Sequence, residues 1–365
     1  MINKMTIENM RCFKQLTLEN ISPLTLIAGK NSVGKSALLE AVFLFLSIRL
    51  SDIFYRILQY RGNQFPSAVF STPQEMTNPD PPPWEQLFTD FDMTKELCIA
   101  MEEETGEAHI LKLSEKEENI STPRIPTYGN SQIVLPPHSG GYRKLEISYS
   151  HNGSISKSYH EYTPPNSNIP SYQVRAPEQQ LPRWPATFYY RSYFTLTSLP
   201  DWFGKIDLEG KKDDLVKYIN ILDDSIQDLF IVPSRNLGQI YARRRLQKSL
   251  PLRAMGDGIN NLLNFLLIMI ANPGCVLLID EIENGFHHSF HETLWKVLST
   301  VAKNNNCQVF ATTHSYECIA GAADGVIDKS MLSMVRLGIK RGEIFPYHSS
   351  GDELAFALEQ EMEVR

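Results

Sequence analysis

The fold is decided by one stretch near the start of the chain, which reads Gly29-Lys30-Asn31-Ser32-Val33-Gly34-Lys35-Ser36. The apolar run 24–28 precedes it, and a second apolar run begins at residue 37. Strand, glycine-rich loop and helix in this order are what a phosphate-binding loop requires. Gly29 and Gly34 allow successive N–H groups to turn toward a phosphate, at which the new helix also directs its positive dipole end. The stretch therefore predicts a nucleotide-binding loop, in preference to a chance glycine turn before an amphipathic helix.

Two side chains of this loop have separate roles toward a nucleotide. Lys35 can reach the β- and γ-phosphates, and the Ser36 hydroxyl can coordinate Mg²⁺. The sequence therefore predicts ATP and Mg²⁺ as ligands. The residues expected to contact them are Gly29, Lys30, Asn31, Ser32, Val33, Gly34, Lys35, Ser36 and Ala37.

Two later apolar runs end in polar residues that suit the same chemistry. Residues 275–279 form a run typical of a strand buried on both faces, and Asp280 and Glu281 follow it. Asp280 is expected to hold Mg²⁺, and Glu281 to orient or deprotonate an attacking water as a catalytic residue. The run 308–313 leads to His314, which is expected to reach the γ-phosphate. Each run alone is weak support, but their order behind a phosphate loop makes them specific.

Together these motifs resemble a known family. The set consists of residues 29–36, 255–258, 278–285 and 312–315, with further likeness at 9–13 and 316–318. It is similar to the head of ABC-type ATPases, most closely the bacterial branch that includes the OLD-family (overcoming lysogenization defect) ATPases. RecF and SMC heads are more distant, and many members of the branch are described simply as AAA-type ATP-binding proteins. The resemblance covers roughly residues 1–50 and 225–365 and leaves the middle uninformative.

The resemblance implies an α/β fold, a two-lobed ABC-type P-loop ATPase head. Its core is a mixed sheet, with an antiparallel β lobe and a helical signature lobe. We expect one composite domain over residues 1–365, with a first lobe at 1–162, a Pro-rich crossover at 163–185 and a second lobe at 186–365. Six prolines in that crossover predict that it contains no regular element.

The resemblance also implies a second nucleotide contact, made across an interface between two subunits. In the family the signature motif binds the γ-phosphate of the nucleotide on the opposite subunit through a helix start. That position is occupied here by Met255, Gly256, Asp257 and Gly258. The usual serine is missing, which puts a hydroxyl contact in doubt, and a simple helix cap by Asp257 is the alternative interpretation.

Two first-lobe residues are implied less directly by the resemblance. Arg11 occupies a position that lies close to the nucleotide in the family, and a surface arginine in a hairpin turn is the alternative. A glutamine that senses Mg²⁺ has Gln86 as its nearest candidate. Three others compete with it, namely Gln59, Gln64 and Gln74.

Composition is that of an intracellular enzyme. The 365 residues carry a net charge of 35 − 42 = −7, which gives no global basic field to recruit nucleic acid or an acidic membrane. The chain starts without the apolar core of a secretory signal, and no apolar run approaches the length of a membrane-spanning helix. The five cysteines form no close pair in sequence, and three of them lie in or beside predicted core strands, so they are read as buried thiols and not as metal ligands. These features predict a cytoplasmic protein.

Several further elements are expected from local patterns. Antiparallel strands are predicted at 5–9 with 16–20, at 97–101 with 108–113, at 144–149 with 155–159 and at 334–339 with 343–347. Helical spacing predicts a helix over 211–228, one from 36 to about 50 that can continue through 58, and a last one over 352–363. The run 243–245 of three arginines is more simply solvated than phosphate-binding. His287, His288 and His291 are not expected to hold a metal, because neighbouring helical side chains diverge by about 100°.

The predicted function is hydrolysis of ATP between two heads arranged head to tail. The leading role is a sensor or regulator in a bacterial system such as anti-phage defence, with a separate nuclease or toxin as effector. One alternative is a RecF- or SMC-like DNA-repair or DNA-binding head, and another is a nucleotide-gated scaffold with little turnover. We expect no TOPRIM nuclease domain, because about 50 residues follow His314 and no Asp-x-Asp occurs. We also expect no long coiled-coil arms, because prolines interrupt the middle of the chain.

Overall fold

The structure is a computed structural model, which describes residues 1–48, 50, 52–61, 82–117, 143–162, 172–175, 186–189, 199–233, 238–245 and 248–364. Contacts between residues group the chain into two compact units, and neither is continuous in sequence. Unit 1 consists of Met1–Lys4, Thr17–Ser47 and Arg183–Arg365, and unit 2 consists of Met5–Leu16 and Ile48–Pro182. The expected first lobe is thus shared: its phosphate-binding loop packs within unit 1 and its hairpins within unit 2. No helix in the described ranges is both long and apolar enough to cross a membrane.

Unit 1 is built on a six-stranded mixed sheet. Its strands, in spatial order, are β16 (Glu343–Ser350), β15 (Leu332–Lys340), β3 (Leu24–Gly29), β14 (Gln308–Thr312), β13 (Val276–Ile279) and β9 (Ala186–Tyr189). The strands from β15 to β9 are parallel to one another, and β16 returns antiparallel to β15 in the expected final hairpin. The carboxyl ends of β3, β13 and β14 therefore share one edge of the sheet.

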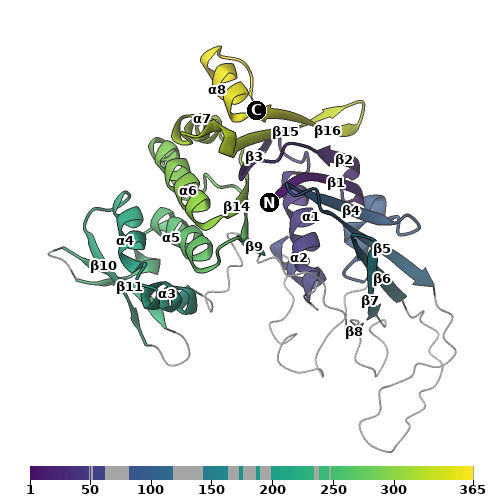
Figure 1. Cartoon of the computed structure of the whole chain (residues 1–365), viewed down its shortest axis with the longest axis horizontal. Coiled ribbons are helices and arrows are strands. Elements are labelled where there is room, and N and C mark those ends of the chain that lie inside the picture. Colours follow the sequence, from purple (N-terminus) through teal and green to yellow (C-terminus); the bar gives the residue numbers. More distant parts are fainter. Residues whose placement is uncertain are drawn as a thin grey trace, which may run out of the picture. The chain divides into compact units, whose positions relative to one another are not determined.

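Helices cover both faces of this sheet. α1 (Lys35–Ser47) packs on one face; α5 (Asp257–Ala271), α6 (His291–Asn305) and α7 (Tyr316–Gly325) lie on the other (Figure 1). Strand β9 illustrates how both faces are covered, because consecutive side chains of a strand point to opposite faces of the sheet. Phe188 contacts Phe43 of α1 at a ring-centroid distance of 5.6 Å, and Tyr189 contacts Phe265 of α5 at 4.9 Å. The central strand β13 is apolar and buried on both faces, which is why it appears in the sequence as an unbroken apolar run.

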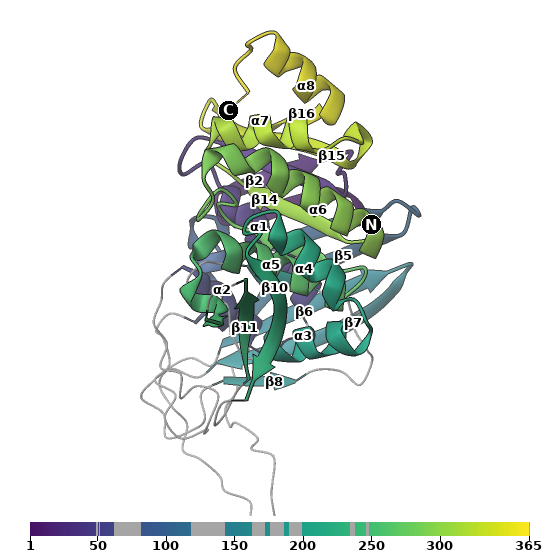
Figure 2. The ribbon, with the colours of Figure 1, turned by 90° about the vertical axis from the view of Figure 1, so that its left-hand side faces the viewer.

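A small subdomain of unit 1 surrounds the start of α5. It contains the antiparallel strands β10 (Ile226–Val232), β11 (Gln239–Arg244) and β12 (Leu250–Pro251) with the helices α3 (Leu199–Leu208) and α4 (Lys212–Asn220) (Figure 2). The helix predicted over 211–228 is wrong beyond residue 220, because Ile226 already belongs to β10. Helix α3 was not predicted. Arg243 and Arg244 of the arginine run form ion pairs with Asp228 and Asp223.

Unit 2 contains most of a seven-stranded sheet with the spatial order β2-β1-β4-β5-β6-β7-β8. Its strands are β1 (Ile2–Met10), β2 (Phe13–Leu18), β4 (Leu97–Glu103), β5 (Ala108–Glu117), β6 (Arg143–His151), β7 (Ser154–Tyr162) and β8 (Tyr172–Arg175). The three hairpins predicted here are confirmed. The absence of any regular element in 163–185 is wrong, because β8 pairs with β7 in a stretch that lies between Pro170 and Pro177 and contains no proline.

The remaining elements are short. The helix from residue 36 ends at Ser47 and a separate α2 (Ile53–Tyr60) follows, while α8 (Gly351–Glu359) closes the described chain with a capping box at Ser350. Single 3-10 turns occur at Glu85–Leu87, Thr89–Phe91, Leu252–Ala254, His288–Phe290 and Lys329–Met331.

Candidate nucleotide-binding site

The phosphate-binding loop joins β3 to α1, as its sequence predicts. Gly29 ends β3 with a φ of 140°, and Ser32 and Gly34 also have positive φ values, of 63° and 95°. Gly29 is required by packing as well, since a Cβ there would lie 2.6 Å from the carbonyl oxygen of Leu337 on β15. The loop backbone therefore has the unusual turns that a cradle of N–H groups needs.

Lys35 is buried inside this loop, with 5% of its surface exposed. Its Nζ donates to the carbonyl oxygens of Gly29 and Lys30 at 2.7 and 2.9 Å and lies 3.2 Å from Nδ1 of His314. Burial lowers the pKa of Lys35, and the nearby carboxylates, led by Asp280, oppose that shift. The ammonium thus occupies the centre of the cradle, next to the histidine expected to contact the γ-phosphate.

Ser36 and Asp280 meet at the carboxyl edge of the sheet. The Ser36 hydroxyl donates to both carboxylate oxygens of Asp280, at 3.0 and 3.2 Å. Hydroxyl and carboxylate oxygens are the ligands that Mg²⁺ prefers, and the ion usually takes only one or two protein ligands and fills the remainder with water and phosphate. The pair therefore fits the predicted Mg²⁺ site.

A buried threonine connects this pair to the expected catalytic carboxylate. Thr312, at the end of β14, donates through Oγ1 to Oδ1 of Asp280 at 2.6 Å and accepts from the backbone N–H of Glu281 at 2.8 Å. Thr312 is fully buried. One hydroxyl therefore fixes both the orientation of Asp280 and the position at which Glu281 leaves the strand.

Glu281 itself is exposed and held in an uncommon backbone conformation. Its φ is 53°, a region that costs a non-glycine residue about 1–3 kcal/mol and that concentrates at functional sites. The side chain of Asn284 donates to Oε2 of Glu281 at 2.6 Å. The next carboxylate, Glu283, accepts from the backbone N–H of His314 at 2.8 Å. The structure thus brings Lys35, Ser36, Asp280, Glu281 and His314 together.

Three residues of this network, Thr312, Glu283 and Asn284, were not predicted as site residues. The available signal was position, because each lies within four residues of a predicted one in the motifs 278–285 and 312–315. Their roles depend on contacts between β13 and β14, which are neighbours in the sheet but about 30 residues apart in sequence.

The signature-like helix start is packed against the loop that follows Glu281. Gly256 precedes α5 with a φ of 88°, and the side chain of Asn261 donates to the carbonyl oxygen of Asn284 at 2.9 Å. A Cβ at Gly258 would lie 2.8 Å from the carbonyl oxygen of Gly285. Close packing within one chain therefore already requires Gly258, whereas the space beside Gly256 is open.

Comparison with known proteins places this geometry in a family. Residues 24–320 match the family described as "AAA domain, putative AbiEii toxin, Type IV TA system". The chain belongs to this AAA family. A curated relative, an "ATP/GTP phosphatase" of Helicobacter pylori, is 24% identical over 381 residues, and the match covers 99% of each chain. An uncharacterized protein of Methanocaldococcus jannaschii is 43% identical over 60 residues, 16% of this chain and 27% of that protein.

The fold comparison agrees with this AAA-family membership. An SMC head, solved bound to the C-winged helix domain of ScpA, matches with a TM-score of 0.50 and 12% identity over 98% of this chain and 99% of that one. At this identity the likeness shows the fold alone. The fold is that of an ABC-type P-loop ATPase head, as the motifs predict.

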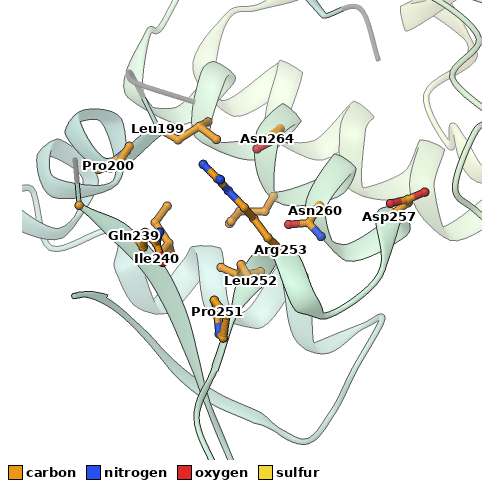
Figure 3. A pocket seen from close by; sticks show the side chains of 12 residues that line it. Leu199, Pro200, Gln239, Ile240, Pro251, Leu252, Arg253, Asp257, Asn260 and Asn264 are labelled. Atoms are coloured by element: carbon orange, nitrogen blue, oxygen red, sulfur yellow. The ribbon is translucent and has the colours of Figure 1, made fainter. Parts of the chain in front are cut away.

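A cavity of about 260 Å³ lies beside α5 in this AAA-family chain (Figure 3). Apolar side chains of α3, β11 and residues 251–252 form much of its lining, and Arg253, Asn260 and Asp257 contribute polar groups. Asn264, also in the lining, donates to the hydroxyl of Tyr189 at 3.3 Å. The cavity is distinct from the phosphate-binding loop, but it shares helix α5 with the signature-like motif.

Two other predicted residues lie in unit 2. The Arg11 guanidinium donates to the carbonyl oxygen of Gln86 at 2.6 Å, and its backbone N–H donates to Leu87. The contact of Arg11 with nucleotide stays a prediction. Of the competing glutamines, Gln59 lies in α2 and Gln86 in a 3-10 turn, while Gln64 and Gln74 lie outside the described residues.

Proposed function

We propose that this protein hydrolyses Mg²⁺-ATP and serves as the nucleotide-dependent sensor or regulator subunit of a bacterial, defence-like system. The observation that carries the proposal is the hydrogen-bonded chain from Ser36 through Asp280 and Thr312 to the backbone of Glu281. It connects the metal-binding side chains to a carboxylate in the order that phosphoryl transfer to water needs.

Each residue has one task in this reaction. Lys35 and the loop N–H groups bind the phosphates, so Lys35 exchanges its carbonyl and His314 contacts for phosphate oxygens. Mg²⁺, held near Ser36 and Asp280, would neutralise charge on the phosphates. Glu281 orients the attacking water and accepts its proton, and Asn284 keeps the carboxylate in place. His314 contacts the γ-phosphate from the end of β14.

A second copy of the chain completes the site in this proposal. Met255, Gly256 and Asp257 form a helix start whose exposed N–H end suits an anion, and Gly256 leaves open space beside it. The nucleotide would join two heads only through its higher affinity for the closed pair.

The regulatory role is supported by the family and by the fold. The family description names a toxin of a toxin–antitoxin system, and an SMC head of this fold was solved with a domain of another protein. We propose a separate effector protein, a nuclease or toxin, on that basis. The described cysteines form no disulfide, which suits the reducing cytoplasm.

The first experiment measures phosphate release by the wild type and by Glu281→Gln. Loss of a general base slows turnover by about 10²-fold or more, while Mg²⁺-ATP binding is expected to persist because Lys35, Ser36 and Asp280 remain. Normal turnover by Glu281→Gln would reject its assigned role. ATP retained by the wild type without phosphate release would instead support the scaffold alternative, and stimulation by duplex DNA would support the DNA-binding alternative.

The second experiment tests the composite site by light scattering of Glu281→Gln protein with and without Mg²⁺-ATP. Substitutions at Gly256 or Gly258 would disturb the backbone or packing, so we choose Ala254→Glu, an exposed position just before the motif. Its carboxylate should repel the incoming γ-phosphate and prevent ATP-dependent association. Thr300→Glu, exposed on α6, adds the same charge elsewhere and should leave association unchanged. Association that survives Ala254→Glu contradicts the composite site.

A further inference from the structure

Two histidines and two glutamates meet at the turn end of the unit 2 sheet, outside the nucleotide site. β4 and β5 form one hairpin and β6 and β7 the next, and both turns lie at the same end of the sheet. The register places His109 of β5 directly opposite His151 of β6. Across the first hairpin, the backbone N–H of Glu103 donates to Glu107 at 2.9 Å. The pairing of three strands therefore brings four potential metal ligands to one place.

The side chains of these residues converge. The two imidazole rings stack at 4.3 Å with an interplanar angle of 9°. Nε2 of His109 lies 3.2 Å from a carboxylate oxygen of Glu103, and Nε2 of His151 lies 3.6 Å from one of Glu107. One ligand atom from each of Glu107, His109 and His151 lies within 4.8 Å of the other two. Among the His, Cys, Asp and Glu side chains in the described part of the chain, these three form the group that is close enough to share an ion.

These distances suit a small divalent ion once the partly exposed His151 ring turns out of the stack, because two nearly parallel imidazole planes cannot both contain one ion. In a tetrahedral zinc site with bonds of about 2.0–2.1 Å, neighbouring ligand atoms lie about 3.4 Å apart. The two His–Glu distances already bracket that value. Two carboxylates and two neutral imidazoles carry a charge of −2, which a divalent cation balances, and imidazole nitrogen favours zinc over Mg²⁺ or Ca²⁺.

The surroundings also suit a metal site. Nδ1 of the buried His109 lies 2.7 Å from the hydroxyl of Tyr149, so a hydrogen bond there can fix the ring and leave Nε2 directed at the carboxylates. An orienting partner on the second nitrogen is typical of metal-binding histidines. The side chains of His151 and Glu107 are 37% and 50% exposed, which provides a path for the ion.

We propose that His109, His151 and Glu107, with Glu103 or water as the fourth ligand, bind Zn²⁺ or a similar divalent transition metal. Because the ligands come from the β4–β5 turn, β5 and β6, the bound ion fastens one hairpin to the next at their turns. The same cluster of four side chains without a bound metal is the competing outcome of the test.

The test is a Co²⁺ titration of the full chain without nucleotide, followed by displacement with Zn²⁺. We expect one equivalent of Co²⁺ with the visible absorption of tetrahedral coordination. His151→Gln and Glu107→Gln change exposed side chains, so folding should persist, and each should weaken binding by at least about 10-fold. Tyr149→Phe removes only the orienting hydroxyl, for which the expected loss is about 10–100-fold.

Two control variants separate this site from others in the chain. Asp280→Asn alters the proposed Mg²⁺ site, and His287→Gln alters one of a pair of neighbouring histidines whose rings lie 4.1 Å apart. Both should bind Co²⁺ as the wild type does. Wild-type protein that fails to bind Co²⁺ in tetrahedral coordination, or unchanged affinity in both His151→Gln and Glu107→Gln, overturns the proposal.

Discussion

Thr312→Val is the most direct test of the hydrogen-bonded chain in the nucleotide site. Valine has nearly the shape of threonine, so the change removes the hydroxyl and leaves the packing of a fully buried position intact. The hydroxyl donates to the Asp280 carboxylate at 2.6 Å and accepts from the Glu281 N–H at 2.8 Å. A hydrogen bond to a charged group is worth about 1.5–3 kcal/mol, and an N–H that loses its acceptor costs about 1–3 kcal/mol.

Allowing for non-additivity, we expect a loss of about 3 kcal/mol in the interactions that position the two carboxylates. If about half of this appears in the transition state, kcat falls by about 10-fold, and if nearly all appears it falls by about 100-fold. ATP binding through Lys35 should change little. Phosphate release at saturating ATP and the melting temperature measure the two parts of the effect.

Two matched variants make the result interpretable. Thr25→Val removes a buried hydroxyl from the neighbouring strand β3, where it donates to the carbonyl oxygen of Ser22 at 3.0 Å, away from Asp280. It should lower stability and leave kcat near the wild-type value. Thr312→Ser keeps the hydroxyl and should restore most of the activity. Equal kcat for Thr312→Val and Thr25→Val would refute the reasoning.

Two further predictions follow from burial and charge. Lys35→Ala removes the ammonium at the centre of the cradle and should abolish tight ATP binding in equilibrium dialysis, and unchanged affinity would reject the site. Burial lowers the pKa of His160 to about 3. Below about pH 6.5 this histidine therefore gains a proton in the unfolded chain but stays neutral in the folded protein, so the free energy of unfolding decreases as the pH falls. Between pH 7 and 5 this amounts to about 2 kcal/mol, which His160→Leu should remove from the pH dependence of urea unfolding; an equal pH dependence in both proteins would contradict it.

The sequence predicted the core of the site because its motifs are local. A phosphate-binding loop such as residues 29–36 contains its strand end, its glycines and its helix start in one segment, so spacing alone indicates the geometry. Asp280 and His314 were found by their order behind that loop. Thr312 was not, because a hydroxyl at the end of an apolar strand has no pattern of its own, and its role arises only when β14 lies next to β13.

The errors in the fold have similar causes. Apolar residues at helical spacing continue past the end of α4, but Ile226 and Leu229 are buried residues of strand β10. The local spacing fits a helix, and the pairing of β10 with β11 determines that the segment is a strand. The many prolines in 163–185 led to the prediction of no regular element there. The four residues of β8 nevertheless form an edge strand, which requires pairing with one neighbour, β7. The packing of Gly258 against Gly285 joins segments 27 residues apart, which no local signal reveals.

Asn284 connects the proposed catalytic carboxylate to helix α5. Its side chain donates to Glu281, and its backbone carbonyl accepts from the side chain of Asn261 on α5. Thermodynamic linkage then imposes a symmetry on this head. Any molecule that binds beside α5 and moves Asn261 must change the free energy of the ATP-bound state, and ATP must change the affinity for that molecule by the same factor. A ligand of the cavity along α5 in Figure 3 that moves Asn261, the neighbour of the lining residue Asn260, would therefore be linked to ATP binding, and each would report the occupancy of the other.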